Sequence, residues 1–306
     1  MPPIICIGAA FIDELFYVKD QILPGTTSDS NCLRSAGGVS RNIAHQLGLL
    51  EVPVQLIAVF GSDSEGEWLK KQCRDAGVKL DASITRDGYT GKYTGIVQPD
   101  GSLFTAFLSN AANHLVSPHY LENNRELLLT ASYILSDTNI SIESLEWLLD
   151  FSRINGIPLI IEPVSVPHAA KLKNINLEGL YLVTPNEDEL PAICKRNFGS
   201  IDEEVKALLD RGVKNIWLHH GANGSVFYNQ EKKIHLPALP TGVVDSTGAG
   251  DAALAGFLLG KFLEKEDTEC MKLAHSLAFE ILKVKGANAS NINRQQLMNL
   301  VKNYYP

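Results

Sequence analysis

The sequence has no cysteine pattern of the kind that builds disulfide frameworks or zinc sites. Its cysteines are few, odd in number and never spaced as C-x-x-C. They are Cys6, Cys32, Cys73, Cys194 and Cys270. Scattered free cysteines are typical of proteins in a reducing compartment, so we expect a cytoplasmic protein.

Long apolar runs and an excess of positive charge are missing as well. No run reaches the ~18 apolar residues that a membrane span needs, so no membrane partner is expected. The apolar N-terminal segment lacks a basic flank and a small-residue cleavage site, which favours a buried strand over a signal peptide. The formal net charge is −8, and nucleic-acid binding needs a basic surface, so no nucleic-acid partner is expected either.

Apolar segments that alternate with amphipathic segments dominate the rest of the sequence. The apolar runs are continuous and rich in Val and Ile, which predicts strands covered on both faces. These runs are Ile4–Ile7, Val54–Phe60, Tyr133–Leu135, Pro158–Ile161, Leu180–Val183 and Ile216–Leu218. The helices predicted between them are Ser40–Leu50, Glu65–Ala76, Ile142–Asn155 and Asp202–Arg211. This βαβ rhythm predicts an α/β fold with a doubly wound, mostly parallel sheet and helices on both of its faces.

Two stretches interrupt this rhythm, at about residues 14–36 and 90–110. The first has no helical period, and the second reads as two strands joined by the turn Pro99-Asp100-Gly101. A P-D-G turn between alternating apolar residues is a hairpin signal. We expect these insertions to form a small β lid over a binding cleft; the alternative is an edge hairpin that only extends the sheet. No linker divides the chain, so a single domain of residues 1–306 is predicted.

The most informative segment is DSTGAGD, residues 245–251, which precedes an apolar helix. Gly248, Ala249 and Gly250 would form the first turn of that helix, where free amides and the helix dipole bind anions. A carboxylate beside a phosphate suits a base that accepts the proton of an attacking hydroxyl, so Asp251 is the candidate base. The alternative is that Asp251 only favours the start of the helix.

A second glycine-containing segment, AGGVSRN at residues 36–42, also precedes a helix. The Asn42 amide offers both a donor and an acceptor, which suits a sugar hydroxyl. Asp13 is predicted to end the first strand, where ligands of open α/β sheets bind. A tight turn at the glycines and a capping carboxylate at Asp13 are the alternatives.

A third segment, TPNEDE at residues 184–189, follows a predicted strand. Asn186 and Glu189 are three residues apart and are predicted to share a helix face. The carboxylates of this segment would serve a magnesium ion, or they only complement the dipole at a helix start.

Several familiar motifs fail or fit poorly. No phosphate-binding loop of the form G-x-x-x-x-G-K-[ST] is present. The pattern Gly248-x-Gly250-x-x-Ala253 fits a loose dinucleotide fingerprint and keeps a nicotinamide oxidoreductase as an alternative. His219 and His220 are neighbours on a predicted strand and would point to opposite faces, which disfavours a shared metal ion.

Together these segments resemble the ribokinase-like (PfkB) family of carbohydrate kinases over nearly the whole chain. The matching motifs, in family order, are G-x-x-x-x-D at Gly8–Asp13, G-G-x-x-x-N at Gly37–Asn42, N-x-x-E at Asn186–Glu189, G-x-x-G at Gly221–Gly224, D-x-T-G-A-G-D at Asp245–Asp251 and G-A-x-x-S at Gly286–Ser290. The resemblance implies an ATP-dependent kinase that phosphorylates a sugar or nucleoside hydroxyl, with Asp251 as its base. A non-catalytic sugar-binding relative stays an alternative.

The resemblance also implies a three-part site. Asp13, Gly38 and Asn42 would hold sugar hydroxyls, and Gly248 and Gly250 would stabilise the charge on the transferred phosphoryl group. The positions implied for the ATP phosphates and Mg²⁺ are Asn186, Glu189, Gly221 and Gly224, and the position implied beside the adenine is His275. The positions implied for K⁺ are Asp245, Thr247, Ile281, Val284, Gly286 and Ser290. Lid strands of this family often pair between subunits, which implies a homodimer.

Within the family the chain most resembles pseudouridine kinases. The segments that carry this likeness are GGVSRNIAHQLG, LSDTNI at Leu135–Ile140 and EPVSVPHAAKL at Glu162–Leu172. They imply phosphorylation of pseudouridine on its 5′-hydroxyl; ribose or another sugar is the alternative acceptor. Asp137, Asn139 and Ser165 would contact the uracil ring or support its partners from behind. Alternatively, Asp137 and Ser165 only cap strand-end turns. The chain departs from the pattern at Ser109–His114, which lacks the expected Asp-Met, and at His219, where the family usually has threonine.

Overall fold

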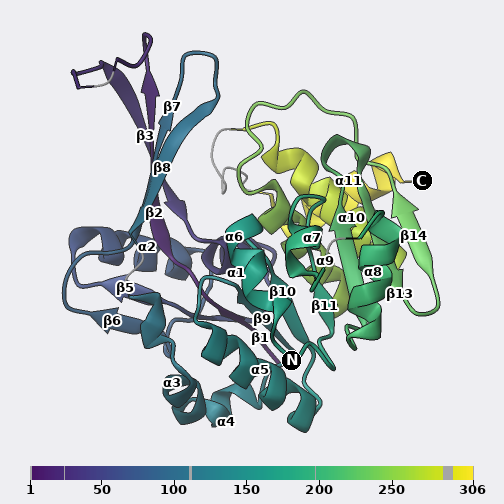
Figure 1. Cartoon of the computed structure of the whole chain (residues 1–306). Coiled ribbons are helices and arrows are strands. Elements are labelled where there is room, and N and C mark those ends of the chain that lie inside the picture. The colour runs from purple at the N-terminus through teal and green to yellow at the C-terminus, as the bar shows by residue number, and fades with distance from the viewer. Residues whose placement is uncertain (1, 24, 110–111, 197, 285–291, 306) are drawn as a thin grey trace.

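The computed structural model describes residues 2–23, 25–109, 112–196, 198–284 and 292–305 (Figure 1). Its centre is an eight-stranded sheet in the order β14-β13-β12-β11-β10-β9-β1-β4. The strands are β1 (Ile4–Ile7), β4 (Val54–Ile57), β9 (Tyr133–Asp137), β10 (Leu159–Glu162), β11 (Leu182–Val183), β12 (Asn215–His219), β13 (Ser225–Asn229) and β14 (Lys233–Leu236). Every pair from β4 to β12 is parallel, and only β13 and β14 add antiparallel pairs at one edge. The predicted mostly parallel sheet is confirmed.

Both faces of the sheet are buried under helices, as the continuous apolar runs predict. In β1, Ile4 and Cys6 pack into one core cluster and Ile5 and Ile7 into the other, because neighbouring side chains point to opposite faces. The first cluster includes residues of α1 (Val39–Leu49), α2 (Ser64–Asp75), α9 (Ala249–Phe262), α10 (Asp267–Ile281) and α11 (Arg294–Tyr304). The second includes residues of α3 (Pro118–Asn123), α4 (Arg125–Leu128), α5 (Ile142–Asn155), α6 (Val166–Ala169), α7 (Glu189–Ile193) and α8 (Ile201–Asp210). Two apolar cores on one sheet define the doubly wound architecture.

The helices begin and end where local chemistry favours it. Asp63, Ser141 and Ser200 accept hydrogen bonds from backbone amides at the starts of α2, α5 and α8. Gly156 ends α5 in the left-handed conformation, with φ of 69°, which glycine adopts without steric cost. The four helices predicted from the sequence therefore match α1, α2, α5 and α8 to within one residue at each end.

One predicted strand is divided. The apolar run Val54–Phe60 leaves the main sheet at Ala58, and β5 (Val59–Gly61) pairs instead with β6 (Ile84–Arg86) in a separate two-stranded sheet. The Ala58 carbonyl accepts a hydrogen bond of 2.8 Å from the Ile84 amide, which turns the chain toward its new partner. A run of apolar residues predicts burial but does not say which strand it will pair with.

The lid is a separate four-stranded sheet that projects from the α/β body (Figure 1). Its strands, in spatial order, are β3 (Ser30–Gly37), β2 (Phe11–Val18), β7 (Lys92–Val97) and β8 (Leu103–Ser109). The two predicted insertions supply these strands, so the prediction of a β lid is confirmed over the edge-hairpin alternative. Glu65 of α2 ties the lid to the body, because its carboxylate pairs with Arg34 of β3 and, at 2.9 Å, with Lys92 of β7.

None of the helices in the described ranges is both long and apolar enough to cross a lipid bilayer.

Candidate active site

The candidate base lies at the start of α9. Gly248 precedes the helix in the left-handed conformation, with φ of 78°, and Ala249 is the first helical residue. A side chain built on Gly250 would meet no atom within 4 Å, so this turn faces open space. Amides in the first turn of a helix lack acceptors within the helix. Here the Ala249 amide donates a 3.2 Å hydrogen bond to the Ser246 carbonyl, while the space beside Gly250 is open. The turn predicted to bind an anion is thus a helix start with open space beside it, and its role stays a prediction.

Asp251 is only 9% exposed, although it lies one residue beyond this opening. Its Oδ2 accepts a 2.6 Å hydrogen bond from Asn42 Nδ2 of α1, the helix that packs beside α9. Burial raises the pKa of Asp251 to about 7; the Asp137 and Asp13 carboxylates add to the rise, while Asn42 and Arg41 oppose it. A carboxylate whose pKa lies near neutrality is well suited to accept and release a proton.

The glycine pair before α1 allows close approach of backbone and carboxylate. A side chain on Gly38, whose φ is 94°, would meet the Ala9 carbonyl oxygen at 2.4 Å. A side chain on Gly37 would meet the Asp13 carboxylate at 2.2 Å. Asn42 and Asp251 lie directly behind this turn, so the structure joins two of the segments that the sequence analysis singled out.

The predicted position of Asp13 at the end of the first strand is wrong. The first strand ends at Ile7, and Asp13 lies inside β2 of the lid, paired across from Ser35. The chain turns between Gly8 and Ala10, so one apolar run contributes to two sheets. Burial raises the pKa of Asp13 to about 6, and the Arg41 guanidinium opposes that rise.

The segments that resemble pseudouridine kinases lie at the carboxyl ends of β9 and β10, and they contain Asp137, Asn139 and Ser165. Asp137 is fully buried, and its carboxylate accepts hydrogen bonds from the backbone amides of Ala9 (3.0 Å), Ser40 (2.9 Å) and Asn139 (2.9 Å). The Ser165 hydroxyl lies 2.8 Å from Nδ1 of His168. These contacts fit a supporting role for Asp137 behind the site, between the start of the lid and the start of α1.

Asn139 differs from Asp137 in how its side chain is used. The residue is 7% exposed, and within the described residues its side-chain amide has no hydrogen-bond partner. The Asn139 amide is not among the fully buried polar atoms without a partner, so a ligand or water can reach it.

Sequence reasoning missed Glu162, which ends β10. Its Oε2 accepts a 2.8 Å hydrogen bond from the Val164 amide. Burial raises the pKa of Glu162 well above its ordinary value, and Asp251, Glu189 and Asp137 add to the rise. The available signal was a carboxylate at the end of a buried apolar run, at the edge of the sheet where such folds bind ligands.

The segment with Asn186 corrects a second prediction. Asn186 and Glu189 do not share a helix face, because Asn186 precedes α7 and Glu189 begins it. The Asn186 side chain accepts hydrogen bonds from the amides of Asp188 and Glu189, both 2.9 Å, and the Glu189 carboxylate accepts one from the Asn186 amide at 3.0 Å. Burial raises the pKa of Glu189, and the bond from Asn186 opposes that rise. The turn is a reciprocal cap that holds Glu189 in place.

The end of β12 lies beside this turn. The His219 amide donates a 2.9 Å hydrogen bond to the Pro185 carbonyl, and burial lowers the pKa of His219 to about 3, so its ring is neutral. Gly221 is open to added atoms, whereas a side chain on Gly224 would meet the Leu236 carbonyl at 2.2 Å. His275 is fixed from two sides, by the Ser225 hydroxyl at 2.8 Å and the Pro237 carbonyl at 3.1 Å.

The positions implied for K⁺ belong to two chain segments that meet. The Val244 amide donates a 2.8 Å hydrogen bond to the Leu282 carbonyl, which brings Asp245 and Thr247 near Ile281 and Val284. The Asp245 carboxylate accepts a 2.9 Å hydrogen bond from the Thr247 amide. Gly286 and Ser290 lie outside the described residues.

The residues present fit a magnesium–nucleotide complex. In the ranges that the structure describes, no three His, Cys, Asp or Glu side chains are close enough to hold a metal by themselves. Mg²⁺ bound to a nucleotide commonly uses one or two carboxylates together with substrate phosphates. The Glu189 carboxylate raises the pKa of Glu162, and these two carboxylates are the candidates for this role.

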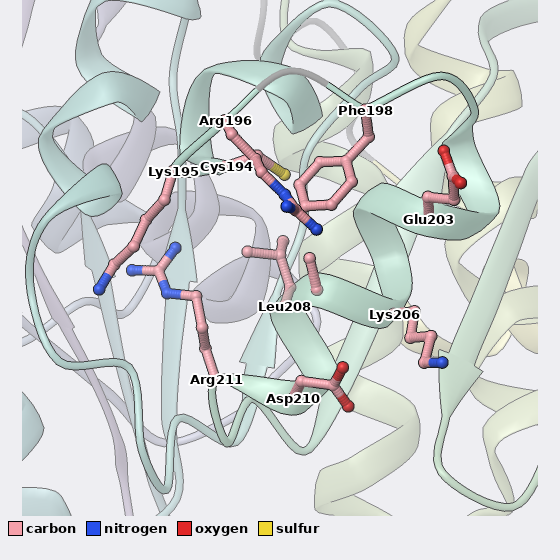
Figure 2. Close-up of a pocket in the computed structure, with 10 residues that line it drawn as sticks. Cys194, Lys195, Arg196, Phe198, Glu203, Lys206, Leu208, Asp210 and Arg211 are labelled. Atoms are coloured by element: carbon pink, nitrogen blue, oxygen red, sulfur yellow. The ribbon is translucent and has the colours of Figure 1, made fainter.

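A separate hollow of about 670 Å³ lies between the end of α7 and α8, and Figure 2 shows its lining. The Arg196 guanidinium lies over the Phe198 ring at 4.8 Å, and Arg211 donates to the carbonyls of Ile193, Leu172 and Ile175. None of the predicted site residues lines this hollow, so it is not part of the candidate active site.

Comparisons with known proteins agree with this geometry. The model of the pfkB family of carbohydrate kinases matches residues 1–294. A pseudouridine kinase of Escherichia coli is 26% identical over 98% of this chain and 96% of its own length. A ribokinase of Arabidopsis thaliana is 27% identical over 98% of this chain and 81% of its own. The solved structure of Arabidopsis thaliana ribokinase complexed with ribose and ATP superposes with a TM-score of 0.84 at 25% identity, covering 98% of this chain and 99% of that one.

Proposed function

Because the chain belongs to the pfkB family of carbohydrate kinases, we propose that it transfers the terminal phosphoryl group of ATP to the 5′-hydroxyl of pseudouridine. Family membership gives an ATP-dependent phosphotransferase for a sugar or nucleoside and leaves no support for the nicotinamide oxidoreductase alternative. The acceptor and the roles of individual residues are our proposal. The observation that carries them is the buried Asp251, held by Asn42 at the start of a helix that opens onto free space.

Asp251 accepts the proton of the attacking hydroxyl in this proposal. The hydroxyl oxygen forms a bond to the terminal phosphorus of ATP, the bond from that phosphorus to the bridging oxygen breaks, and ADP leaves. The amides around Gly248 and Gly250 stabilise the negative charge that spreads over the transferred group. Asp13 and the turn at Gly38 hold the neighbouring sugar hydroxyls.

In this proposal the nucleotide lies on the side of Asp251 opposite to the acceptor. Gly221 and Gly224 form a turn beside the Asn186–Glu189 cap, and both segments face the phosphates; His275 lies beside the adenine. Bound Mg²⁺ neutralises phosphate charge, and Glu162 and Glu189 are the side chains that would hold it. The neutral ring of His219 leaves the phosphate region without an added cation at that position.

The uracil ring of pseudouridine carries two N–H donors and two carbonyls, which need polar partners in a buried site. The Asn139 amide offers both a donor and an acceptor, and the fully engaged Asp137 fixes the Asn139 backbone from behind. A site for ribose alone would not need an amide at this position. The similarity to the E. coli pseudouridine kinase supports the same acceptor.

Release of ADP with pseudouridine, uridine and ribose, compared by kcat/KM, tests the proposal. We expect pseudouridine to win by at least about tenfold, since a site with polar partners strongly rejects analogues that lack them. Mass spectrometry and phosphorus NMR of the product identify the 5′-phosphate. An Asn139→Ala variant should lose activity toward pseudouridine and keep most of its activity toward ribose. A tenfold preference for ribose or uridine would overturn the acceptor but leave the family intact.

We propose K⁺ as an activating ion, held by oxygen atoms of the segments around Asp245 and Val284. A cation beside the phosphoryl site would offset phosphate charge. Turnover should rise when K⁺ replaces tetramethylammonium at constant ionic strength. Equal rates in the two salts would reject the ion without touching the kinase activity.

We also propose that two copies of this chain pair through their lids. The outer strand β8 exposes apolar side chains that water disfavours: Leu103, Phe104, Phe107 and Leu108. Light scattering should give a dimer for the wild type and a monomer for Phe107→Glu. A monomeric wild type would contradict this pairing.

A further inference from the structure

A single arginine is completely buried directly behind the site. Arg41 of α1 is 0% exposed, although guanidinium groups are almost never fully buried unless they are paired. Taking such a charge out of water costs several kcal/mol after relaxation, so the surrounding groups must compensate for it. Neither family motifs nor sequence periodicity singled this residue out.

The contacts of Arg41 connect the glycine turn to the side chain that holds the base. Its Nε donates to the Gly37 carbonyl at 3.1 Å, and its Nη2 donates to the Ala36 carbonyl at 2.7 Å. Nη2 also donates to Oδ1 of Asn42. Nη1 is buried with no partner among the described residues.

The hydrogen bond from Arg41 Nη2 to Asn42 Oδ1 determines which way the Asn42 amide faces. A guanidinium can only donate, so the atom of Asn42 that it contacts must be the oxygen. The nitrogen of the same amide then faces Asp251 and donates to Oδ2 at 2.6 Å. A reversed amide would place its nitrogen against Arg41 and its oxygen against the carboxylate, and both contacts would be repulsive. Arg41 therefore makes Asn42 a donor to Asp251. The Asn42 amide engages Oδ2 of Asp251, which leaves Oδ1 of Asp251 to meet the acceptor hydroxyl.

Arg41 also places a positive charge among the carboxylates of the site. The groups that interact electrostatically or by hydrogen bonds with Asp251 are Arg41 and Asn42 of α1, Asp13 of β2, Asp137 of β9 and Glu162 of β10. The guanidinium opposes the rise that burial causes in the pKa of both Asp251 and Asp13. Arg41 also interacts electrostatically with Cys73 of α2, whose thiol has its pKa raised by burial and stays neutral near pH 7.

We propose that Arg41 is a positioning residue for the base: it fixes the Asn42 amide with its nitrogen toward Asp251, and it supplies the buried positive charge that balances the carboxylates at the acceptor site. The inference rests on the proposed role of Asp251 as base. The competing view is that Arg41 only ties the end of β3 to α1.

The Arg41→Met variant removes the charge and the directed donors while keeping most of the side-chain volume. We expect kcat to fall about 10²-fold, the loss typical of a misplaced reacting group, with the acceptor KM within about threefold of wild type. The acid limb of the kcat–pH profile should move up by about one pH unit or more, because loss of a nearby positive charge raises the pKa of a carboxyl group. Arg41→Lys keeps the positive charge but lacks the several directed N–H donors of the guanidinium. Its acid limb should therefore stay at the wild-type pH, while its kcat should still be lower than that of the wild type.

Arg211 provides a matched control. Its guanidinium, like that of Arg41, makes three hydrogen bonds, in this case to backbone carbonyls at 2.8, 2.8 and 3.0 Å, but it contacts no residue of the site. Arg211→Met should lower the thermal midpoint while leaving kcat and the acid limb unchanged. If Arg41→Met behaves in the same way, with kcat and the limb close to wild type, Arg41 is structural and the proposal is overturned.

Two further measurements keep the test decisive. If Arg41→Met does not fold, Arg41→Lys decides, and full kcat in that variant overturns the positioning role. Carbon-13 titration of the Asp251 carboxyl group needs no turnover, so it separates this inference from the proposed function. A higher Asp251 pKa in Arg41→Met supports the inference even if none of the tested acceptors is phosphorylated, and an unchanged pKa overturns the electrostatic part.

Discussion

Two glycine-containing turns open the two helices that meet at this site, and they use glycine in opposite ways. Before α1, Gly37 and Gly38 allow atoms of the Asp13 carboxylate and the Ala9 carbonyl to come within 2.2 Å and 2.4 Å of where a side chain would start. In the first turn of α9, a side chain on Gly250 would have nothing within 4 Å. The first turn is filled by the protein itself, and the second is left open for a ligand.

The difference assigns the two turns separate tasks. The close contacts of the α1 turn bring Asp13, Asn42 and the buried Arg41 to one place. The α9 turn leaves open space beside Asp251, the proposed base. In sequence both appear as glycines before an apolar helix, so only the surrounding atoms distinguish a packed turn from an open one.

The largest effect should come from the carboxylate where the two helices meet. Asp251→Asn removes a base worth roughly 10²–10⁴-fold in rate, and kcat at saturating acceptor and ATP should fall by that factor. The fold and ATP binding should be retained, as circular dichroism and calorimetric titration with ATP can check. A loss of less than tenfold would mean that Asp251 is not the base.

Gly38→Ala should damage stability more than catalysis. The φ of 94° costs a non-glycine residue about 1–3 kcal/mol, and the contact with Ala9 O adds overpacking of similar size. We expect the free energy of unfolding in urea to drop by about 2–5 kcal/mol. Gly101→Ala is the control, since Gly101 has φ of 86° but nothing within 4 Å, and it should show the backbone cost alone. Equal losses in both variants would remove the packing argument.

Gly250→Ala should have the opposite signature. Alanine within a helix stabilises by roughly 0.5–1 kcal/mol relative to glycine, so the protein should unfold at slightly higher urea concentration. The added methyl group enters the space proposed for the phosphoryl group, and kcat should fall about tenfold to 10²-fold. A variant that is both more stable and fully active would show that this opening is not the phosphoryl site.

The smallest expected effect is a difference in the pH at which the carboxylates of the two turns, Asp251 and Asp13, become protonated. The pKa of Asp251 is about 7 and that of Asp13 about 6. Asp251 must be ionised to accept a proton, and an ionised Asp13 forms stronger hydrogen bonds to sugar hydroxyls than a neutral one. Going down in pH, kcat should therefore fall first, below about pH 7, and the acceptor KM should rise only nearer pH 6. The limb in kcat should vanish in Asp251→Asn and persist in Asp13→Asn. A single limb lost in both variants would indicate one coupled titration.

The sequence by itself determined the periodic part of the molecule. Continuous Val- and Ile-rich runs required strands buried on both faces, and capping residues such as Ser141 and Ser200 set helix starts to within a residue. The motif DSTGAGD was enough to predict a carboxylate beside a glycine-containing helix start, because both features depend on neighbours along the chain.

Only the tertiary structure decided the features that depend on distant partners. Whether Val59 continues one sheet or starts another depends on β6, and whether Asp13 belongs to the body or the lid depends on how the chain turns at Gly8. The burial of Arg41, the hydrogen bond between Asn42 and Asp251 and the raised pKa of Glu162 arise where segments far apart in the sequence pack together. Local sequence carries no record of such contacts, because desolvation and hydrogen-bond direction are set by the whole surroundings of a group.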